Sequence, residues 1–227
     1  MTTYIFDVNA ALCPSNQAIN ASFQKIFENW MTKHKVCLIT NNTYDNILPR
    51  IGRKIIDQSA VTFTCGGNVV RMNGKDAIVD TWRPSSDIIS YLERVLKNSE
   101  FKIRSGPNIE YRTGMISFSV VGKAATEEER NRYKTWDKNN RERKSIVDHV
   151  NKTFSNVTAI ISGDTSVDFS NKNHDKSQIL QYFIKEEVIY VTNKQGMYNI
   201  KNIWHNVSIS EVDDWKKTEA YIMRNIK

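Results

Sequence analysis

Long apolar runs and paired cysteines are both missing from this chain of 227 residues. No run of about eighteen apolar residues occurs, and the first residues, M-T-T-Y-I-F-D, lack the basic and apolar regions of a signal peptide. The three cysteines, Cys13, Cys37 and Cys65, form no C-x-x-C pair, so the usual zinc and disulfide patterns are excluded. We therefore expect a soluble, cytoplasmic protein with reduced, buried thiols and no membrane contact.

Glycine is also scarce, with nine residues, and no internal repeat or low-complexity tract is present. The composition that remains is 40% hydrophobic and 25% charged, which is typical of a folded chain rather than a disordered one. A chain of this length can form one large domain or two modest ones.

The net charge of +7 would attract phosphorylated ligands or nucleic acid. The basic residues are not concentrated, because Arg141 to Lys144 lies among acids and asparagines, and aromatic residues do not alternate with them as in a base-stacking surface. We therefore favour the interpretation that the charge keeps the protein soluble, and nucleic-acid binding stays open as an alternative.

The first part of the chain alternates short apolar runs with helical patterns. Strands are expected at Tyr4–Val8 and Val36–Thr40, and helices at Asn16–His34 and Tyr44–Ile51. This order predicts a parallel sheet with helices on its faces. Ligands of such sheets bind beyond the carboxyl ends of the strands.

Four polar residues follow the ends of these two strands. They are Asp7, Asn9, Thr40 and Asn42, and the sheet topology predicts that they share one rim. Thr40 and Asn42 are our candidates for binding a phosphate at that rim.

The middle of the chain has a different pattern. Thr62–Val70 and Arg71–Asp80 indicate a β-hairpin region with a turn at Asn73-Gly74, and Trp82-Arg83-Pro84 indicates a crossing between domains. Further strands are expected at Phe101–Arg104, at Ile109–Val121 and within Val157–Phe169, and helices at Ser86–Asn98 and over most of Glu127–Phe154. Helices on one antiparallel sheet are the simplest assembly of these segments.

The last part returns to the first pattern. A helix is expected at Ile179–Lys185, strands at Val188–Val191 and Val207–Ile209, and a closing helix at Asp213–Arg224. The middle third of the chain is therefore predicted to be an insertion in a discontinuous core.

The stretch from Ile109 to Trp136 joins a strand pattern to a helix that should begin at the capping box of Thr126 and Glu129. Arg112 lies on the strand and Lys123 at its exit, where two cations could reach one anionic ligand. The alternative is a solvated basic face.

Three motifs carry a family resemblance. The segment F-D-V-N-A-A-L at Phe6 to Leu12 resembles the first motif of the haloacid dehalogenase superfamily, an apolar strand followed by D-x-D-x-T. The segment I-E-Y-R-T-G-M-I-S-F-S-V-V-G-K, which starts at Ile109, is similar to the cap signature of eukaryotic-type phosphomannomutases, approximately I-E-F-R-N-G-M-L-N-V-S-P-I-G-R. The segment at Ser162 to Lys176 is similar to their G-G-x-I-S-F-D-V-x-P-x-G-W-D-K.

The resemblance implies an α/β fold, with a Rossmann-like parallel-sheet core of the haloacid dehalogenase type and an inserted α/β cap domain with an antiparallel sheet. The core would comprise residues 1–82 and 176–227, and the cap residues 83–175. The cap would recognise a sugar phosphate, and family members commonly dimerise through it.

Roles follow by position in the matched motifs. Asp7 would be the nucleophile that forms an aspartyl-phosphate, Asn9 stands at the acid/base position, and Lys176 would neutralise the transferring phosphoryl group. Substrate contacts would come from the cap, namely from Arg104, Arg112, Met115, Ser117, Lys123, Ser166 and Asp168. Arg112 and Lys123 would hold the distal phosphate, and Ser166 with Asp168 the hexose.

The departures from the family pattern affect the residues that are expected to carry out catalysis. Asn9 replaces the acid/base aspartate, and an amide does not exchange the catalytic proton at neutral pH. Ala10-Ala11 replaces Gly-Thr, which removes a hydroxyl expected to hold the phosphoryl group. The acidic loop that holds Mg²⁺ in the family is represented by Y-V-T-N-K-Q-G-M-Y-N at Tyr190 to Asn199, which leaves Asp7 as a poor magnesium ligand on its own.

Three functions remain from the sequence, and the third is the nucleic-acid binding named above. The first is a phosphomannomutase-like enzyme that interconverts hexose 6-phosphate and hexose 1-phosphate through Asp7, with weak or lost activity. The second is a catalytically inactive relative that binds a phosphometabolite or a protein partner. The alternative is a purely structural role, in which Met115, Ile116, Phe118, Val120 and Val121 pack the cap sheet and Asp7 caps a strand end.

Overall fold

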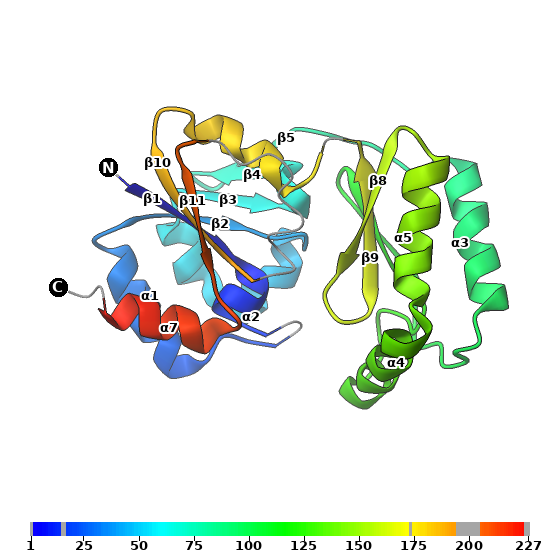
Figure 1. Cartoon of the computed structure of the whole chain (residues 1–227). Helices are drawn as coiled ribbons and strands as arrows, with labels where there is room; N and C mark the ends of the chain where they lie inside the picture. Colours follow the sequence, from blue (N-terminus) through cyan, green and yellow to red (C-terminus); the bar gives the residue numbers. More distant parts are fainter. Residues whose placement is uncertain (1, 15–16, 173, 194–204, 225–227) are drawn as a thin grey trace. The chain divides into compact units, whose positions relative to one another are not determined.

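The chain divides into two compact units. The computed structural model describes residues 2–14, 17–172, 174–193 and 205–224, apart from the side chain of Ala10. The core unit comprises Met1–Val79 and Asp175–Lys227, and the inserted unit comprises Asp80–His174 (Figure 1). The boundaries predicted from the sequence, after residues 82 and 175, differ from these by a few residues.

The core unit is built on a seven-stranded sheet in the order β11-β10-β1-β2-β3-β4-β5. Its parallel strands are β1 (Thr2–Asp7), β2 (Lys35–Ile39), β3 (Val61–Thr64), β10 (Glu187–Thr192) and β11 (Val207–Glu211). The edge is an antiparallel hairpin of β4 (Val69–Met72) and β5 (Lys75–Ile78), which turns at Asn73-Gly74 as predicted.

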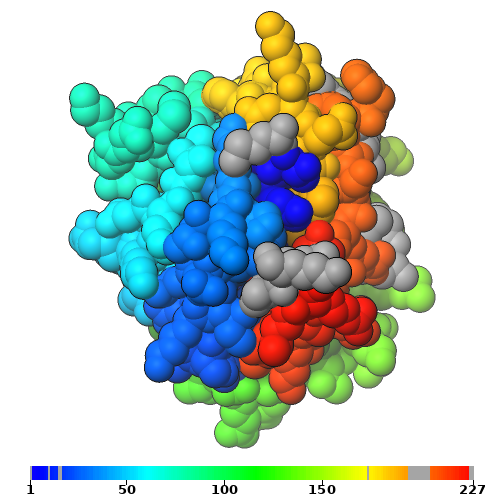
Figure 2. Space-filling view, turned by 90° about the vertical axis from the view of Figure 1, so that its left-hand side faces the viewer, coloured from blue at the N-terminus to red at the C-terminus, as the bar shows by residue number. Residues whose placement is uncertain are grey.

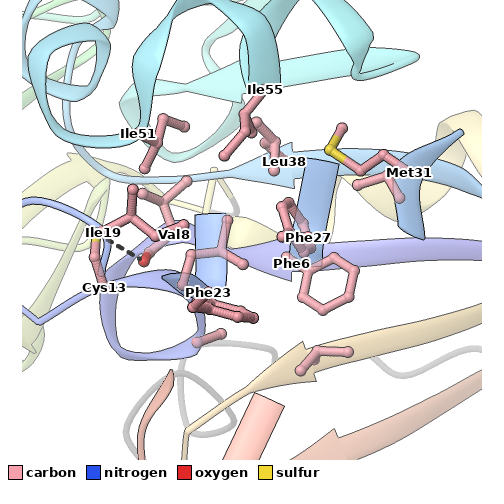
Figure 3. Packing of buried hydrophobic residues seen from close by; sticks show 14 of the residues in the cluster. Phe6, Val8, Cys13, Ile19, Phe23, Phe27, Met31, Leu38, Ile51 and Ile55 are labelled. Carbon is pink, nitrogen blue, oxygen red and sulfur yellow. Dashed lines mark hydrogen bonds between the residues drawn. The ribbon is translucent and has the colours of Figure 1, made fainter. Parts of the chain in front are cut away.

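Both faces of this sheet are covered. Phe6 and Leu38 point to one face, where they pack with residues of α1 (Ala21–Met31), α2 (Tyr44–Gln58) and α7 (Trp215–Arg224) (Figure 3). The alternate residues of the strands, such as Ile5 and Cys37, pack on the other face with the 3-10 helix η3 (Lys176–Phe183). Burial on both faces explains why these strands are continuous apolar runs.

Three helical segments differ from the predicted ones. α1 begins after Asn20, whose side chain accepts hydrogen bonds from the backbone amides of Ser22 and Phe23, so it starts later than expected; Asn16 lies outside the described residues. α2 continues beyond Ile51, with a kink at Gly52, whose φ of +80° interrupts the helical geometry. The segment expected as a helix at Ile179–Lys185 is the 3-10 helix η3.

The closing helix α7 lies beside α1 on the surface of the core unit, as the red and blue atoms of Figure 2 show. Trp215 of α7 stacks on Phe23 of α1, with ring centroids 5.7 Å apart. None of the helices in the described ranges is long and apolar enough to cross a membrane.

The inserted unit has one antiparallel sheet in the order β6-β7-β9-β8. The strands are β6 (Ile109–Arg112), β7 (Met115–Ser119), β8 (Val157–Ser162) and β9 (Ser166–Asn171), and the helices are α3 (Ser86–Asn98), α4 (Glu127–Asn140) and α5 (Glu142–Thr153). The helices cover one face of the sheet (Figure 1). Ile116, Phe118 and Phe169 point to this face and are fully or almost fully buried.

Two strand predictions in this unit are wrong. Ile109–Val121 is not one strand but the hairpin β6-β7, because Gly114 at φ +66° reverses the chain. Phe101–Arg104 forms no strand. The loop that follows it is hydrogen-bonded to the segment after β7: Ser105 N donates to Val121 O, and Ala124 N donates to Ser105 O.

The two ends of the inserted unit meet. Nδ1 of His174 lies 3.1 Å from Oδ2 of Asp80, and the amide of Asn171 donates to the same carboxylate at 3.3 Å. The first and last residues of the unit are thus adjacent in space.

Candidate functional site

Asp7 and Lys176 form a buried ion pair at the carboxyl end of the core sheet. Nζ of Lys176 donates to Oδ2 of Asp7 at 2.5 Å, and both side chains are about 95% buried. Thr192, at the end of the neighbouring strand β10, donates its hydroxyl to the same oxygen at 3.3 Å. The other oxygen, Oδ1, is buried and has no hydrogen-bond partner in the described part of the chain.

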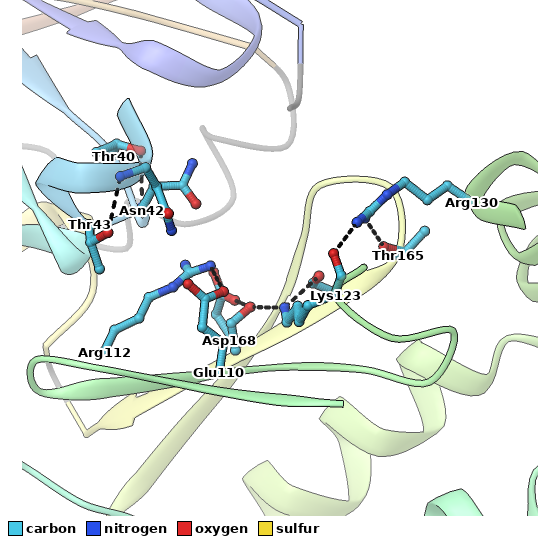
Figure 4. A network of polar contacts seen from close by, with 12 residues as sticks. Thr40, Asn42, Thr43, Glu110, Arg112, Lys123, Arg130, Thr165 and Asp168 are labelled. Carbon is cyan, nitrogen blue, oxygen red and sulfur yellow. Dashed lines mark hydrogen bonds and ion pairs between the residues drawn. The ribbon is translucent and has the colours of Figure 1, made fainter. Parts of the chain in front are cut away.

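The remaining predicted residues of the core follow the ends of β1 and β2. Asn9 lies in the π-helical turn η1 (Val8–Leu12), and its Oδ1 is buried without a hydrogen-bond partner among the residues described. Thr40 Oγ1 accepts from the backbone amide of Asn42 at 3.1 Å (Figure 4). Thr40 is fully buried, whereas Asn42 is partly exposed.

The Mg²⁺ implied by the family resemblance does not fit these residues. The ammonium of Lys176 already neutralises Asp7, and Asn9 contributes a neutral amide oxygen. The sequence has no Asp or Glu between Glu187 and Glu211, so the loop after β10 supplies no carboxylate; Tyr198 and Asn199 of this loop lie outside the described residues. Among the described residues no group of three His, Cys, Asp or Glu side chains could hold a metal ion.

In the inserted unit, a polar sheet face lies opposite the helices. Strand pairing puts Glu110, Ser117 and Asp168 in one row across β6, β7 and β9, and Ser119 opposite Ser166 in another. Side chains that alternate with buried apolar ones along each strand share this face. We call these five residues, with Arg112 and Lys123, the polar face.

Lys123 is the centre of the contacts on the polar face. Its Nζ donates to Ser117 Oγ at 2.7 Å and to Ser166 Oγ at 3.2 Å, and Ser117 donates in turn to Asp168 Oδ1 at 2.5 Å (Figure 4). Burial lowers the pKa of Lys123 to about 8, although the carboxylate of Asp168 opposes this shift.

Arg112 is the second cation of the polar face. Its Nη2 donates to Oε2 of Glu110 at 2.6 Å, and its side chain is 7% exposed. Two cations and two carboxylates thus share this face, so an incoming anion would compete with Glu110 and Asp168 for the same donors.

One of the remaining predicted substrate contacts lies elsewhere and one lies beside Arg112. Arg104 turns its guanidinium onto the backbone carbonyls of Phe101, Ile103 and Leu96, and so is not joined to the Lys123 contacts. Met115 is buried on β7 directly opposite Arg112 and two residues from Ser117, so its side chain lies on the same side of the sheet as the polar face. The alternative that apolar residues of this segment only pack the cap sheet holds for Ile116, Phe118, Val120 and Val121. These four residues belong to the apolar core of the inserted unit.

Sequence reasoning missed three residues that touch the site. Glu110 could have been found, because it alternates with Arg112 in I-E-Y-R and therefore shares its face. Arg130 donates hydrogen bonds to Thr165 and to the carbonyl of Lys123, and no periodicity predicts that these segments, far apart in sequence, meet.

Comparison with known proteins identifies relatives along the whole chain. The family model of eukaryotic phosphomannomutase matches residues 23–198. The phosphomannomutase of Encephalitozoon cuniculi is 25% identical over 231 residues, covering 94% of this chain and 90% of its own, and that of Saccharomyces cerevisiae is 24% identical over 193 residues, covering 82% and 76%.

Solved structures share the fold at low identity. A Thermoplasma acidophilum protein of known structure, 0175, superposes with a TM-score of 0.62 at 13% identity, covering 99% of this chain and 97% of its own. The truncated IMP-nucleotidase of Plasmodium falciparum, solved with IMP, gives 0.60 at 14% identity, with 99% and 68% covered. The fold is therefore α/β, of the haloacid dehalogenase type, with a mainly parallel sheet and a separate antiparallel sheet in the cap. Because the family model matches more than half of its length, this chain belongs to the eukaryotic phosphomannomutase family.

Proposed function

We propose that this chain binds a phosphorylated sugar through the polar face and that its core transfers a phosphoryl group very slowly or not at all. The observation that carries the proposal is the set of contacts around Lys123, which holds a protonatable amine, two serine hydroxyls and the Asp168 carboxylate on one face. Cations suit a phosphate, and hydroxyl and carboxylate groups suit the hydroxyls of a sugar.

The core supports the second half of the proposal. Phosphoryl transfer needs a nucleophile, a proton donor for the leaving oxygen and charge stabilisation of the transferring group. Asp7 and Lys176 can serve as nucleophile and cation, but Asn9 cannot supply the proton and the donor set does not fit Mg²⁺.

Calorimetry with mannose and glucose phosphates tests the binding. Wild type should bind one of them, and Lys123→Met should weaken that binding by about tenfold or more, since a charge-assisted hydrogen bond contributes about 1.5–3 kcal/mol. Lys138→Met, at an exposed position in the last turn of α4, is the matched control and should change nothing. No heat with any sugar phosphate would overturn the proposal and leave the partner-binding alternative.

Residual phosphoryl transfer is a second candidate, favoured by the retained Asp7–Lys176 pair. It would appear as phosphate label on Asp7 after incubation with a hexose bisphosphate and Mg²⁺, and Asn9→Asp should increase the label. If neither wild type nor Asn9→Asp is labelled although the sugar phosphate binds, the chain binds its ligand without phosphoryl transfer.

Dimerisation through the cap, a cytoplasmic location and nucleic-acid binding stay predictions. The last is motivated by the charge of +7, and it requires affinity for DNA that falls steeply as salt rises. Salt-insensitive or absent DNA binding would remove it.

A further inference from the structure

At position 123 this chain has an amine where the family signature has an arginine. A guanidinium stays protonated at neutral pH, whereas a lysine that loses its proton is a nucleophile. Burial lowers the pKa of Lys123 to about 8, so about a tenth of the molecules carry the neutral amine at pH 7. Lys123 is only partly buried, so a small ligand can reach its side chain.

Two serine hydroxyls determine the orientation of this amine. Nζ of Lys123 donates to Ser117 Oγ at 2.7 Å and to Ser166 Oγ at 3.2 Å. Ser117 gives its own hydrogen to Asp168, so its oxygen remains an acceptor for the amine. A neutral amine has two hydrogens and one lone pair. With both hydrogens on the serines, the lone pair is directed away from the two hydroxyls and toward an incoming group.

Arg112 adds a phosphate-binding group to the same face, which Figure 4 shows together with Lys123 and Asp168. Its Nη2 is bonded to Glu110 at 2.6 Å, and a phosphate can compete for this donor. The charges of Arg112 and Arg130 favour the neutral form of Lys123, whereas the carboxylates of Asp168 and Glu110 favour its protonated form. The polar face thus combines a nucleophilic amine with a cation that suits a phosphate.

We propose that Lys123 is a modification site that is acylated by acyl phosphates, the mixed anhydrides of a carboxylic acid and phosphoric acid. The lone pair of Nζ attacks the acyl carbon and forms an amide, and the bond from that carbon to the phosphate oxygen breaks. The departing phosphate takes one proton from the nitrogen and leaves as hydrogen phosphate. The inference rests on the proposed function for the affinity of the polar face for phosphate.

The test compares two acetyl donors on the full chain at pH 8, with the modified lysines quantified by mass spectrometry. Acetyl phosphate carries the phosphate, and the N-hydroxysuccinimide ester of acetic acid does not. Lys138, exposed in the last turn of α4, is the internal reference. The ratio of Lys123 to Lys138 acetylation should be about tenfold or more higher with acetyl phosphate, because binding of the phosphate holds the acyl carbon near the amine.

Inorganic phosphate should abolish this excess without changing the result for the ester. Arg112→Gln should reduce the ratio obtained with acetyl phosphate toward that of the ester. If Arg112→Gln does not fold, competition by phosphate in wild type decides alone. Equal ratios for the two donors in wild type, or an excess that phosphate does not lower, would overturn the proposal.

Acetylation removes the charge of Lys123, so it should also weaken sugar-phosphate binding. Calorimetry with mannose 6-phosphate should show about tenfold weaker binding by the acetylated protein than by wild type. If wild type binds no sugar phosphate but Lys123 shows the phosphate-dependent excess, the proposed function fails and the modification site stands. If wild type binds mannose 6-phosphate and the two donors give equal ratios, the modification site fails and the proposed function stands.

Discussion

At the residue scale, Lys123 differs from the arginine of the family signature in being able to lose its proton. Burial holds the pKa of Lys123 near 8, so the ammonium present at pH 7 is converted to a neutral amine as the pH rises above that value. An anion binds the protonated form, and its binding should in turn raise the pKa of Lys123.

Affinity for a hexose phosphate should therefore fall above pH 8, by about tenfold per pH unit once Lys123 is mostly neutral. Lys123→Arg should extend binding to higher pH, because arginine stays protonated there. Calorimetric titrations from pH 7 to pH 10 measure this. A pH-independent affinity in wild type would contradict the prediction.

The Asp7–Lys176 pair makes a separate prediction about stability. Lys176→Met leaves a buried carboxylate without its cation and should lower the free energy of unfolding by about 3–5 kcal/mol. The double variant Asp7→Asn with Lys176→Met should recover much of this loss, because no buried charge remains unpaired. Urea unfolding measures both, and an additive loss in the double variant would argue against a coupled pair.

At the element scale, the loop of Gly122 determines where Lys123 is presented. Gly122 has φ +95°, and a Cβ there would lie 2.2 Å from the carbonyl oxygen of Ser105. The loops around these two residues are held together by backbone hydrogen bonds, so neither can move aside easily.

Gly122→Ala should accordingly destabilise the protein by about 2–5 kcal/mol, from the left-handed backbone and from overpacking together. Gly74→Ala is the matched control, since Gly74 has φ +74° but no heavy atom within 4 Å of the place a Cβ would occupy, so only the backbone cost of about 1–2 kcal/mol applies. Thermal unfolding of the two variants measures the difference. Equal losses would mean that the close approach to Ser105 costs nothing.

Much of the element pattern can be predicted from the sequence. Helix α3 at Ser86–Asn98 has the bounds that its periodicity predicts, and the buried strands β1 and β2 agree within a residue or two, because their apolar residues satisfy both local pattern and tertiary packing. The hairpin at Gly114 escapes prediction because a glycine within an alternating run gives the same pattern in a continuous strand as in two strands.

The residues of the candidate site can be predicted only where they belong to a sequence motif of the family. The Asp7–Lys176 contact joins residues 169 positions apart and follows from the resemblance, not from periodicity. Arg104 shows the limit of that approach, since its matched position does not determine that its guanidinium turns onto nearby carbonyls.

At the scale of the whole molecule, the two units have separate apolar cores. One cluster includes Ile88, Phe118 and Phe169 and lies within residues 80–174, whereas the other two clusters belong to the core unit. Units with their own cores commonly fold alone.

A fragment of residues 80–174 should thus fold independently, with a cooperative thermal transition and dispersed NMR amide signals. Within it, Lys123 should keep its contacts with Ser117 and Ser166, because all three residues lie in the fragment. A fragment without a cooperative transition would show that the insert depends on the core unit for its fold.

The contact between Asp80 and His174 gives the insert a property of a replaceable module. The chain enters and leaves this unit at neighbouring points, so a linker of a few residues could close the core after its removal. The same adjacency would allow the insert to be grafted into a surface loop of another protein without stretching its ends, and its polar face would be carried along as one unit.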